Sequence, residues 1–189
     1  MMHKLVKLTL ILVFLVKYSS SMPTIKPELG DNSKASIDIN TCDDSKPFQI
    51  DASDFKQVTI NVNGLHASTD IHMLITTHID TIININLTGN PTTGYTHKIV
   101  ELPLESIVKF VESRYIPKKH KEVVLGFGGV YIFEFVSKSA GKTNARIDYA
   151  RFFESQPNPL SKVFIEFIVV EHASGHIEET NSESKLQRQ

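Results

Sequence analysis

Residues 83–95 read Ile-Asn-Ile-Asn-Leu-Thr-Gly-Asn-Pro-Thr-Thr-Gly-Tyr, and this stretch decides the fold. Its first six residues alternate between apolar and polar side chains, which is typical of a strand with one buried face. Pro91 fixes its own φ angle and has no N–H for a β ladder, so the strand stops before it. The stretch therefore predicts a strand followed by a short, rigid turn, with the β-branched residues Thr92 and Thr93 at its tip.

The same alternation recurs on both sides of this stretch. We expect about eight strands, separated by Gly, Pro and Asn residues, over 58–63, 71–76, 83–88, 96–101, 107–115, 130–136, 143–149 and 162–170. No convincing amphipathic helix interrupts them. Recurring short strands predict an all-β fold, and two antiparallel sheets packed face to face would bury the alternate apolar residues.

The two ends of the chain differ from this pattern. Residues 1–21 have a short basic start, an apolar run and three serines before Met22, which predicts a secretory signal peptide. The apolar run is too short to span a bilayer. We expect a loosely ordered extension over 22–54, a β-sandwich domain over 55–172 and a disordered polar tail over 173–189. The extension could be a propeptide, a targeting element or a tether.

Composition excludes several classes of function. A net charge of −1 over 189 residues argues against a nucleic-acid partner, which needs a basic patch. Cys42 is the only cysteine, so it forms no internal disulfide, and the neighbouring Asp43 and Asp44 disfavour a reactive thiolate. His172 and His176 have the spacing of metal ligands on a helix, but Ala-Ser-Gly between them is a poor helix and no third ligand is near. We expect no metal, no cofactor and no enzymatic activity.

Two further stretches stand where strands end. Gly126-Phe127-Gly128-Gly129 either lets the backbone approach another surface closely or forms a plain hairpin turn. Arg151-Phe152-Phe153 follows the strand 143–149, and two adjacent aromatic residues cannot both point into one sheet face. At least one of them is exposed or turned into a loop. The alternative for Phe153 is that it caps the end of the core. Arginine and aromatic residues are enriched at binding hot spots.

In this order and at these intervals, the three stretches resemble the chagasin family of protein inhibitors of papain-like cysteine peptidases. The pattern of that family is an NPTTGY or NPTTGF loop, a GxGG loop and an RPW-like loop, and the resemblance covers roughly residues 55–171. It implies an immunoglobulin-like antiparallel β-sandwich whose three loops close over the peptidase active site. The residues that it implies for peptidase binding are Asn90, Pro91, Thr92, Thr93, Gly94, Tyr95, Gly126, Phe127, Gly128, Gly129, Arg151, Phe152 and Phe153.

The resemblance also implies a role for each loop. The first loop enters the cleft beside the catalytic cysteine of the peptidase, with Thr92, Thr93 and Gly94 nearest to it. The second loop lies along the non-prime side, and the third grips the prime side with an aromatic ring. The partner would be a papain-like, cathepsin-L-like peptidase, and the inhibitor a monomer in the secretory pathway, secreted or endolysosomal. The alternative is an immunoglobulin-like adhesion or recognition module with a non-peptidase ligand.

Two features depart from or complicate this pattern. The third loop reads Arg-Phe-Phe where the family has an RPW-like loop, so we expect a more mobile loop and weaker or altered prime-side binding. Asn86-Leu87-Thr88 is a possible N-glycosylation site, with Asn86 pointing outward by alternation. A glycan there would crowd the first loop, so the site is either unused or its sugar leans away.

Overall fold

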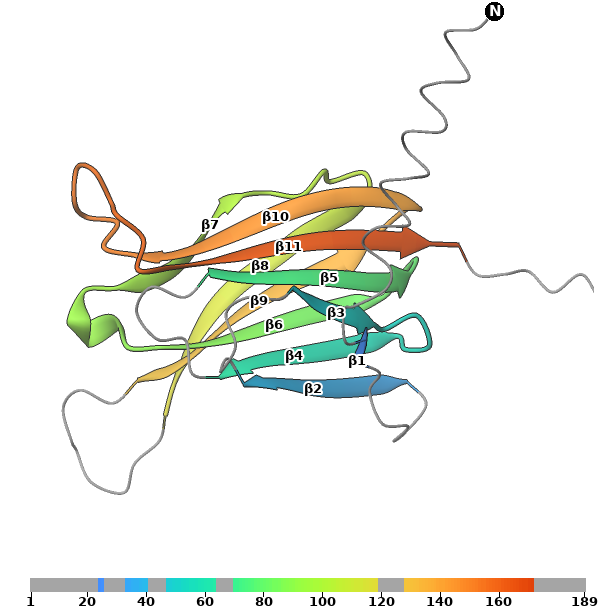
Figure 1. Ribbon diagram of the computed structural model, residues 1–189, viewed down its shortest axis with the longest axis horizontal. Coiled ribbons are helices and arrows are strands. Elements are labelled where there is room, and N and C mark those ends of the chain that lie inside the picture. Colours follow the sequence, from blue (N-terminus) through green and yellow to red (C-terminus); the bar gives the residue numbers. More distant parts are fainter. Residues whose placement is uncertain (1–23, 26–32, 41–46, 64–69, 119–127, 172–189) are drawn as a thin grey trace, which may run out of the picture.

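The computed structural model describes residues 24–25, 33–40, 47–63, 70–118 and 128–171. They form eleven strands and one short 3-10 turn, arranged as two sheets (Figure 1). The spatial order of the six-stranded sheet is β1 (Thr24–Ile25), β3 (Phe48–Asp51), β5 (Asp70–His78), β11 (Ser161–Val170), β10 (Gly141–Ala150) and β7 (Thr96–Glu101). The order of the five-stranded sheet is β2 (Lys34–Asn40), β4 (Gln57–Asn63), β6 (Ile82–Gly89), β9 (Gly129–Ser137) and β8 (Val108–Pro117).

The core lies between the two sheets and is built from alternate residues of their strands. In β4 the buried residues are Val58, Ile60 and Val62, as the alternation predicts. The rings of Phe135 from β9 and Phe167 from β11 meet with centroids 5.3 Å apart, so the two sheets interlock at the centre. Burial of each such side chain contributes about 1.5–3 kcal/mol. The prediction of an all-β sandwich is confirmed.

The position of strand β11 in the sheet explains why its sequence is almost continuously apolar. It lies in the middle of the six-stranded sheet, between β10 and β5. Val163, Ile165 and Phe167 point into the core, while Phe164 stacks on His72 of β5 on the opposite face, with ring centroids 4.6 Å apart. Apolar side chains therefore have partners on both faces of this strand.

The expectation of two antiparallel sheets is wrong for five of the nine strand pairs. Strands β10–β11, β7–β10, β6–β9 and β8–β9 pair antiparallel, but β2–β4, β4–β6, β5–β11, β3–β5 and β1–β3 pair parallel. The chain crosses from one sheet to the other between β4, β5 and β6. Each crossing reverses the chain direction, so two crossings restore it, and β6 returns to its sheet parallel to β4.

The expectation of a loosely ordered extension over 22–54 is also wrong for the described part of that segment. Strand β2 forms an outer strand of one sheet, and β3 pairs with β5 in the other. The polar composition of the segment concealed a short alternation, in which Ala35, Ile37 and Ile39 are buried between exposed neighbours. The folded unit therefore begins before residue 55, and the number of strands rises from about eight to eleven.

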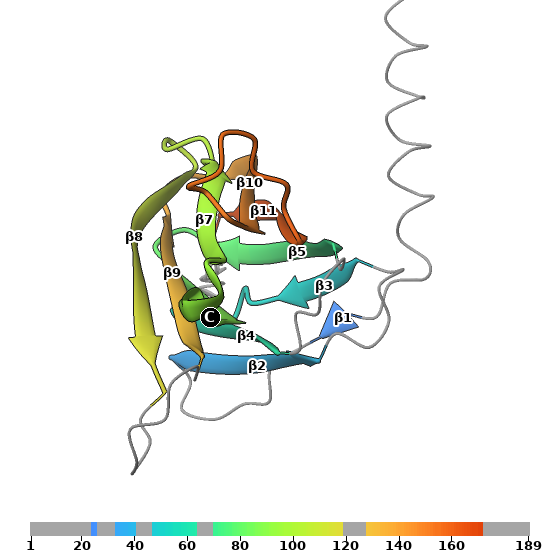
Figure 2. The same cartoon turned by 90° about the vertical axis from the view of Figure 1, so that its left-hand side faces the viewer.

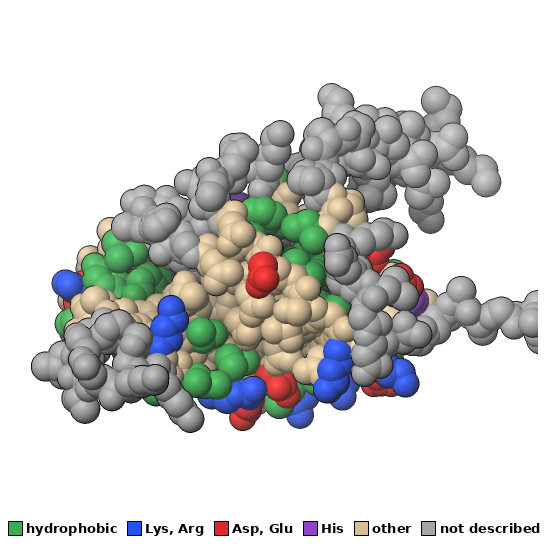
Figure 3. All heavy atoms as spheres, turned by 90° about the horizontal axis from the view of Figure 1, so that it is seen from below, with side chains coloured by type: hydrophobic (Ala, Val, Ile, Leu, Met, Phe, Trp, Pro, Cys, Tyr) green, Lys and Arg blue, Asp and Glu red, His purple; other side chains and the backbone are tan. Residues whose placement is uncertain are grey.

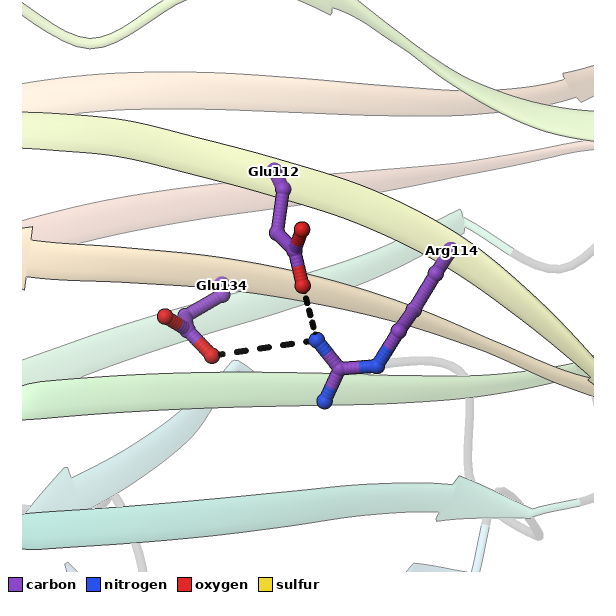
Figure 4. A network of polar contacts seen from close by, with 3 residues as sticks. All are labelled: Glu112, Arg114 and Glu134. Carbon is purple, nitrogen blue, oxygen red and sulfur yellow. Dashed lines mark hydrogen bonds and ion pairs between the residues drawn. The ribbon is translucent and has the colours of Figure 1, made fainter.

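The hairpin of β8 and β9 carries the second of the three sequence motifs. Its register shifts between Phe110 and Glu112, which leaves Val111 unpaired in a bulge. Beyond the bulge, the Arg114 guanidinium contacts the carboxylate of Glu112 and lies 3.9 Å from that of Glu134 on β9 (Figure 4). All three side chains are partly exposed, so the cluster stabilises the hairpin only slightly.

Residues 1–21 and 173–189, Cys42, His172 and His176 lie outside the described residues, and what was expected of them stays a prediction. In the part of the chain that is described, no helix is long and apolar enough to cross a membrane. Figure 3 views the molecule from the side on which β2 lies in Figure 1. On this face the basic and acidic side chains of the described residues are interspersed and form no large basic patch.

Candidate functional site

The first loop is a compact turn stabilised by its own side chains. Pro91–Thr93 form the 3-10 turn η1, and the Asn90 side chain accepts hydrogen bonds from the Thr92 N–H (3.2 Å) and hydroxyl (2.8 Å). The Thr93 hydroxyl donates to the Asn90 carbonyl at 2.7 Å. Gly94 closes the turn at φ +83°, a left-handed angle that favours glycine. Thr92 and Thr93 stand exposed at the tip, as the sequence predicts.

The third loop begins directly after β10 ends at Ala150. Its two ends are closed by backbone hydrogen bonds, from the Glu154 N–H to the Arg151 carbonyl and from the Leu160 N–H to the Tyr149 carbonyl. Phe152 is partly buried, whereas Phe153 keeps 75% of its surface exposed. Phe153 therefore does not cap the core, and the two adjacent rings take different environments.

The first and third loops lie against each other. A β-carbon added to Gly94 would stand 3.2 Å from Cε1 of Phe153, so the ring lies beside the end of the first loop. The Arg151 guanidinium lies over the Tyr95 ring, 4.6 Å from its centroid. This distance is within the range of a cation–π interaction. Residues about sixty positions apart in the sequence thus form one continuous surface.

The second motif reaches the same place from the other sheet. Gly126 and Phe127 lie outside the described residues, but Gly128 and Gly129 are described. A β-carbon on Gly128 would stand 2.7 Å from the Gly89 carbonyl oxygen, and one on Gly129 would stand 2.3 Å from that of Ile116. Both distances are shorter than real contacts allow. These glycines let the backbones approach closely at the base of the first loop.

The described residues of the three motifs accordingly lie at one end of the sandwich. In Figure 1 the connection between β6 and β7, the adjoining ends of β8 and β9 and the connection between β10 and β11 are all on the left. Figure 2 views this end directly. Thr93, Gly128 and Arg151 are therefore at the same pole of the molecule, joined through their contacts with Gly89 and Gly94.

An aromatic cluster under the loops was not found from the sequence. The His97 ring stacks on Tyr149 (centroids 4.3 Å apart) and meets the edge of Tyr131 (5.1 Å). Tyr95 and Tyr115 extend the cluster toward the first and second loops. The members of this cluster lie on four different strands, at the ends next to the loops, or just before such a strand. In the sequence, only their aromatic character could have indicated the cluster.

This cluster also holds the base of the first loop by hydrogen bonds. The Asn90 N–H points to the Tyr149 hydroxyl at 3.4 Å, and the Nε2–H of His97 donates to the Thr88 carbonyl at 3.1 Å. Burial lowers the pKa of His97 to about 4, against this hydrogen bond, so the ring is neutral at pH 7. Burial, with Tyr115 and Tyr149 nearby, raises the pKa of Tyr131 to about 12.

Among the described residues, no group of three or more His, Cys, Asp or Glu side chains is placed to hold a metal ion. Burial raises the pKa of Asp148, on the outer side of β10, although Arg146 and Lys162 oppose the shift. The Asp148 carboxylate forms an ion pair with Arg146 on the same strand, at 3.1 Å.

Asn86 lies on the outer side of β6, since its neighbours Ile85 and Leu87 are fully buried. Its Nδ2, the atom that a glycan would modify, donates to Oδ1 of Asn61 on β4 at 2.7 Å. Asn61 in turn donates to Asp38 on β2 at 2.9 Å. The side chain thus belongs to a ladder across three strands, and its glycosylation stays a prediction.

Comparison with known proteins gives a match to one family model. Residues 76–167 match the family model described as chagasin family peptidase inhibitor I42, a range that contains all three motifs. No curated protein matches the chain.

Three solved structures show a weak overall likeness, each at 15% identity. A cysteine protease inhibitor, EhICP2, from Entamoeba histolytica has a TM-score of 0.45 and covers 75% of this chain and 100% of its own. Amebosin has a TM-score of 0.37, and the match covers 80% of this chain and 100% of amebosin. PbICP-C, solved in complex with falcipain-2, has a TM-score of 0.37, and the match covers 78% of this chain and 98% of PbICP-C.

Proposed function

We propose that this chain, whose residues 76–167 match the chagasin family of peptidase inhibitors, is a reversible, tight-binding inhibitor of papain-like cysteine peptidases. The family consists of inhibitors and not of enzymes, in line with the absence of any enzymatic activity expected from the sequence. The finer claim is that the three loops together occlude the active-site cleft.

The observation that carries this proposal is the convergence of the three motifs. The first loop supplies a stiff tip of small polar residues, Thr92 and Thr93, and the third supplies an exposed aromatic ring, Phe153, directly beside it. A rigid tip loses little conformational entropy on docking, which increases affinity without additional contact area. An exposed aromatic residue beside an arginine is the composition of a binding hot spot.

The proposed contact needs a surface of sufficient area. A stable protein–protein contact takes about 800 Å² from each partner. Three neighbouring loops can supply such an area, and inhibition then results from blocked access of substrate. We propose in addition that the protein acts as a monomer in the secretory or endolysosomal lumen, on the strength of the predicted signal peptide in residues 1–21.

The experiment is a titration of residues 22–189 against papain and a cathepsin-L-like peptidase, with a small peptide substrate. We expect stoichiometric and reversible loss of activity. Trypsin, a serine peptidase, is the control and should be unaffected. Failure to inhibit any papain-like enzyme would contradict the proposal and favour a recognition module with a different ligand.

A further inference from the structure

A second cation–π contact fastens the third loop, and its cation comes from a residue outside the three motifs. Nζ of Lys98, on β7, lies 4.9 Å from the ring centroid of Phe152. The contact mirrors the one between Arg151 and Tyr95, in which the third loop supplies the cation and the end of the first loop supplies the ring. Phe152 in the third loop is thus held by Lys98 on β7, and its neighbour Arg151 is held by Tyr95, just before β7.

Lys98 is well placed for this role. It pairs in register with Asp148 of β10, so its side chain stands on the outer side of the sheet next to the strand that leads into the third loop. The Lys98 side chain is exposed and reaches the Phe152 ring as that ring folds back over β7. Asp148, the acidic residue opposite Lys98 in the register, forms an ion pair with Arg146 at 3.1 Å.

The contact has a consequence for Phe153. Phe152 and Phe153 are the two central residues of a turn that is closed by the hydrogen bond from the Glu154 N–H to the Arg151 carbonyl. Within this turn the Phe152 ring lies at Lys98, while Phe153 lies beside Gly94 and stays 75% exposed. Phe152 stands at the position where the family pattern has a proline, which would fix the backbone by its ring. Lys98 supplies a constraint from outside the loop instead.

We propose that Lys98 is a positioning residue that orders the third loop and thereby presents Phe153 for binding; its effect on inhibition rests on the proposed function. An exposed cation–π contact contributes about 0.5–1 kcal/mol, which corresponds to a change of about two- to five-fold in an equilibrium constant. Loss of the contact increases the mobility of residues 151–154 in the free protein and weakens inhibition by that factor. The stability of the fold is unchanged, because Lys98 lies outside the core.

The test compares Lys98→Met, which keeps the length of the side chain but not its charge, with Lys98→Arg, which keeps the cation. The control is Lys109→Met, on β8, which removes a lysine that is 52% exposed and has an acidic neighbour, Glu105, at 4.0 Å. Two quantities are measured for each variant: backbone ¹⁵N order parameters of residues 151–154 without peptidase, and the inhibition constant for papain.

We expect lower order parameters and weaker inhibition for Lys98→Met, with both restored in Lys98→Arg and unchanged in Lys109→Met. Unchanged order parameters in Lys98→Met overturn the proposal, and so does a mobile loop in a variant that inhibits as well as the wild type. If the order parameters fall but even the wild type inhibits no peptidase, the positioning by Lys98 is supported and the proposed function is what fails.

Discussion

Gly94 and Phe153 lie in contact across the first and third loops, 3.2 Å from the position of a Gly94 β-carbon to Cε1 of the ring. Gly94 also has a φ of +83°. The same glycine thus satisfies two conditions, since it closes the first loop in a left-handed conformation and leaves room for the aromatic ring of the third. This contact is where two distant parts of the sequence become a single surface.

Replacement of Gly94 by alanine should weaken inhibition. The left-handed angle costs about 1–2 kcal/mol for a residue with a β-carbon, and the methyl group pushes against Phe153. We expect inhibition of papain about ten-fold weaker, because the loop and the ring both shift. Gly141→Ala is the matched control, since Gly141 also has a positive φ (+150°) and a close neighbour, Ile107, but lies at the far end of β10. If both variants inhibit equally well, the first loop is not the contact.

Phe153→Ala should separate binding from stability. Because the ring is 75% exposed, its loss should change the free energy of unfolding by no more than about 0.5 kcal/mol. A hot-spot aromatic residue contributes about 2 kcal/mol or more to binding, so inhibition should fall about thirty-fold. The control is Leu104→Ala, an exposed residue (59%) whose N–H bonds to Thr143 near the start of β10, far from the loops. Unchanged inhibition constants for Phe153→Ala would remove this residue from the interface.

Gly128→Ala should disturb the junction of the first and second loops. The added carbon would be 2.7 Å from the Gly89 carbonyl oxygen, which belongs to the backbone and cannot swing away. We expect a loss of about 1–3 kcal/mol in stability, as for overpacking elsewhere, together with weaker inhibition. Thermal denaturation and the papain titration measure the two effects. A variant with wild-type stability would show that this junction is looser than the contacts indicate.

Acid should destabilise the platform of the loops through His97. Its pKa is 6.5 in the unfolded chain and about 4 in the folded protein, because burial disfavours the charged ring. Between these values the unfolded state binds more protons, so the free energy of unfolding falls as the pH falls from about 6.5 to about 4. The loss reaches about 3 kcal/mol and is absent above this window.

The measurement is urea denaturation of the wild type and His97→Gln between about pH 7 and about pH 4. The raised pKa of Asp148 acts in the opposite direction, but both proteins contain that residue, so the difference between them isolates His97. We expect a shallower dependence on pH in the variant. Parallel curves for the two proteins would contradict a buried, neutral His97.

The sequence was sufficient for the features that depend on local chemistry. The alternation in 83–88 and the proline at Pro91 predict the end of β6 and the turn after it, and both are found. The adjacent aromatic residues Phe152 and Phe153 predict that one ring is exposed, as Phe153 is. These features follow from the φ angle of a proline and from the two-residue period of a strand, which are properties of a few neighbouring residues.

The features that depend on tertiary arrangement were missed. The parallel pairing of β4 with β6 results from the crossing of β5 to the other sheet, and alternation within a strand does not record which sheet the strand joins. The alternation in β2 was too short to outweigh the polar residues around it. Lys98 and His97 acquire their roles from rings contributed by other segments, so no local pattern marks them.

The most direct test of the central claim is to map the contact surface in solution. The amide spectrum of ¹⁵N-labelled protein, residues 22–189, is recorded with and without unlabelled papain. We predict that the perturbed signals cluster on Thr92, Thr93, Gly94, Gly128, Arg151 and Phe153, while Leu104 and Gly141 at the far end are unchanged. Perturbations centred on Leu104 and Gly141, with the three loops unaffected, would contradict the account.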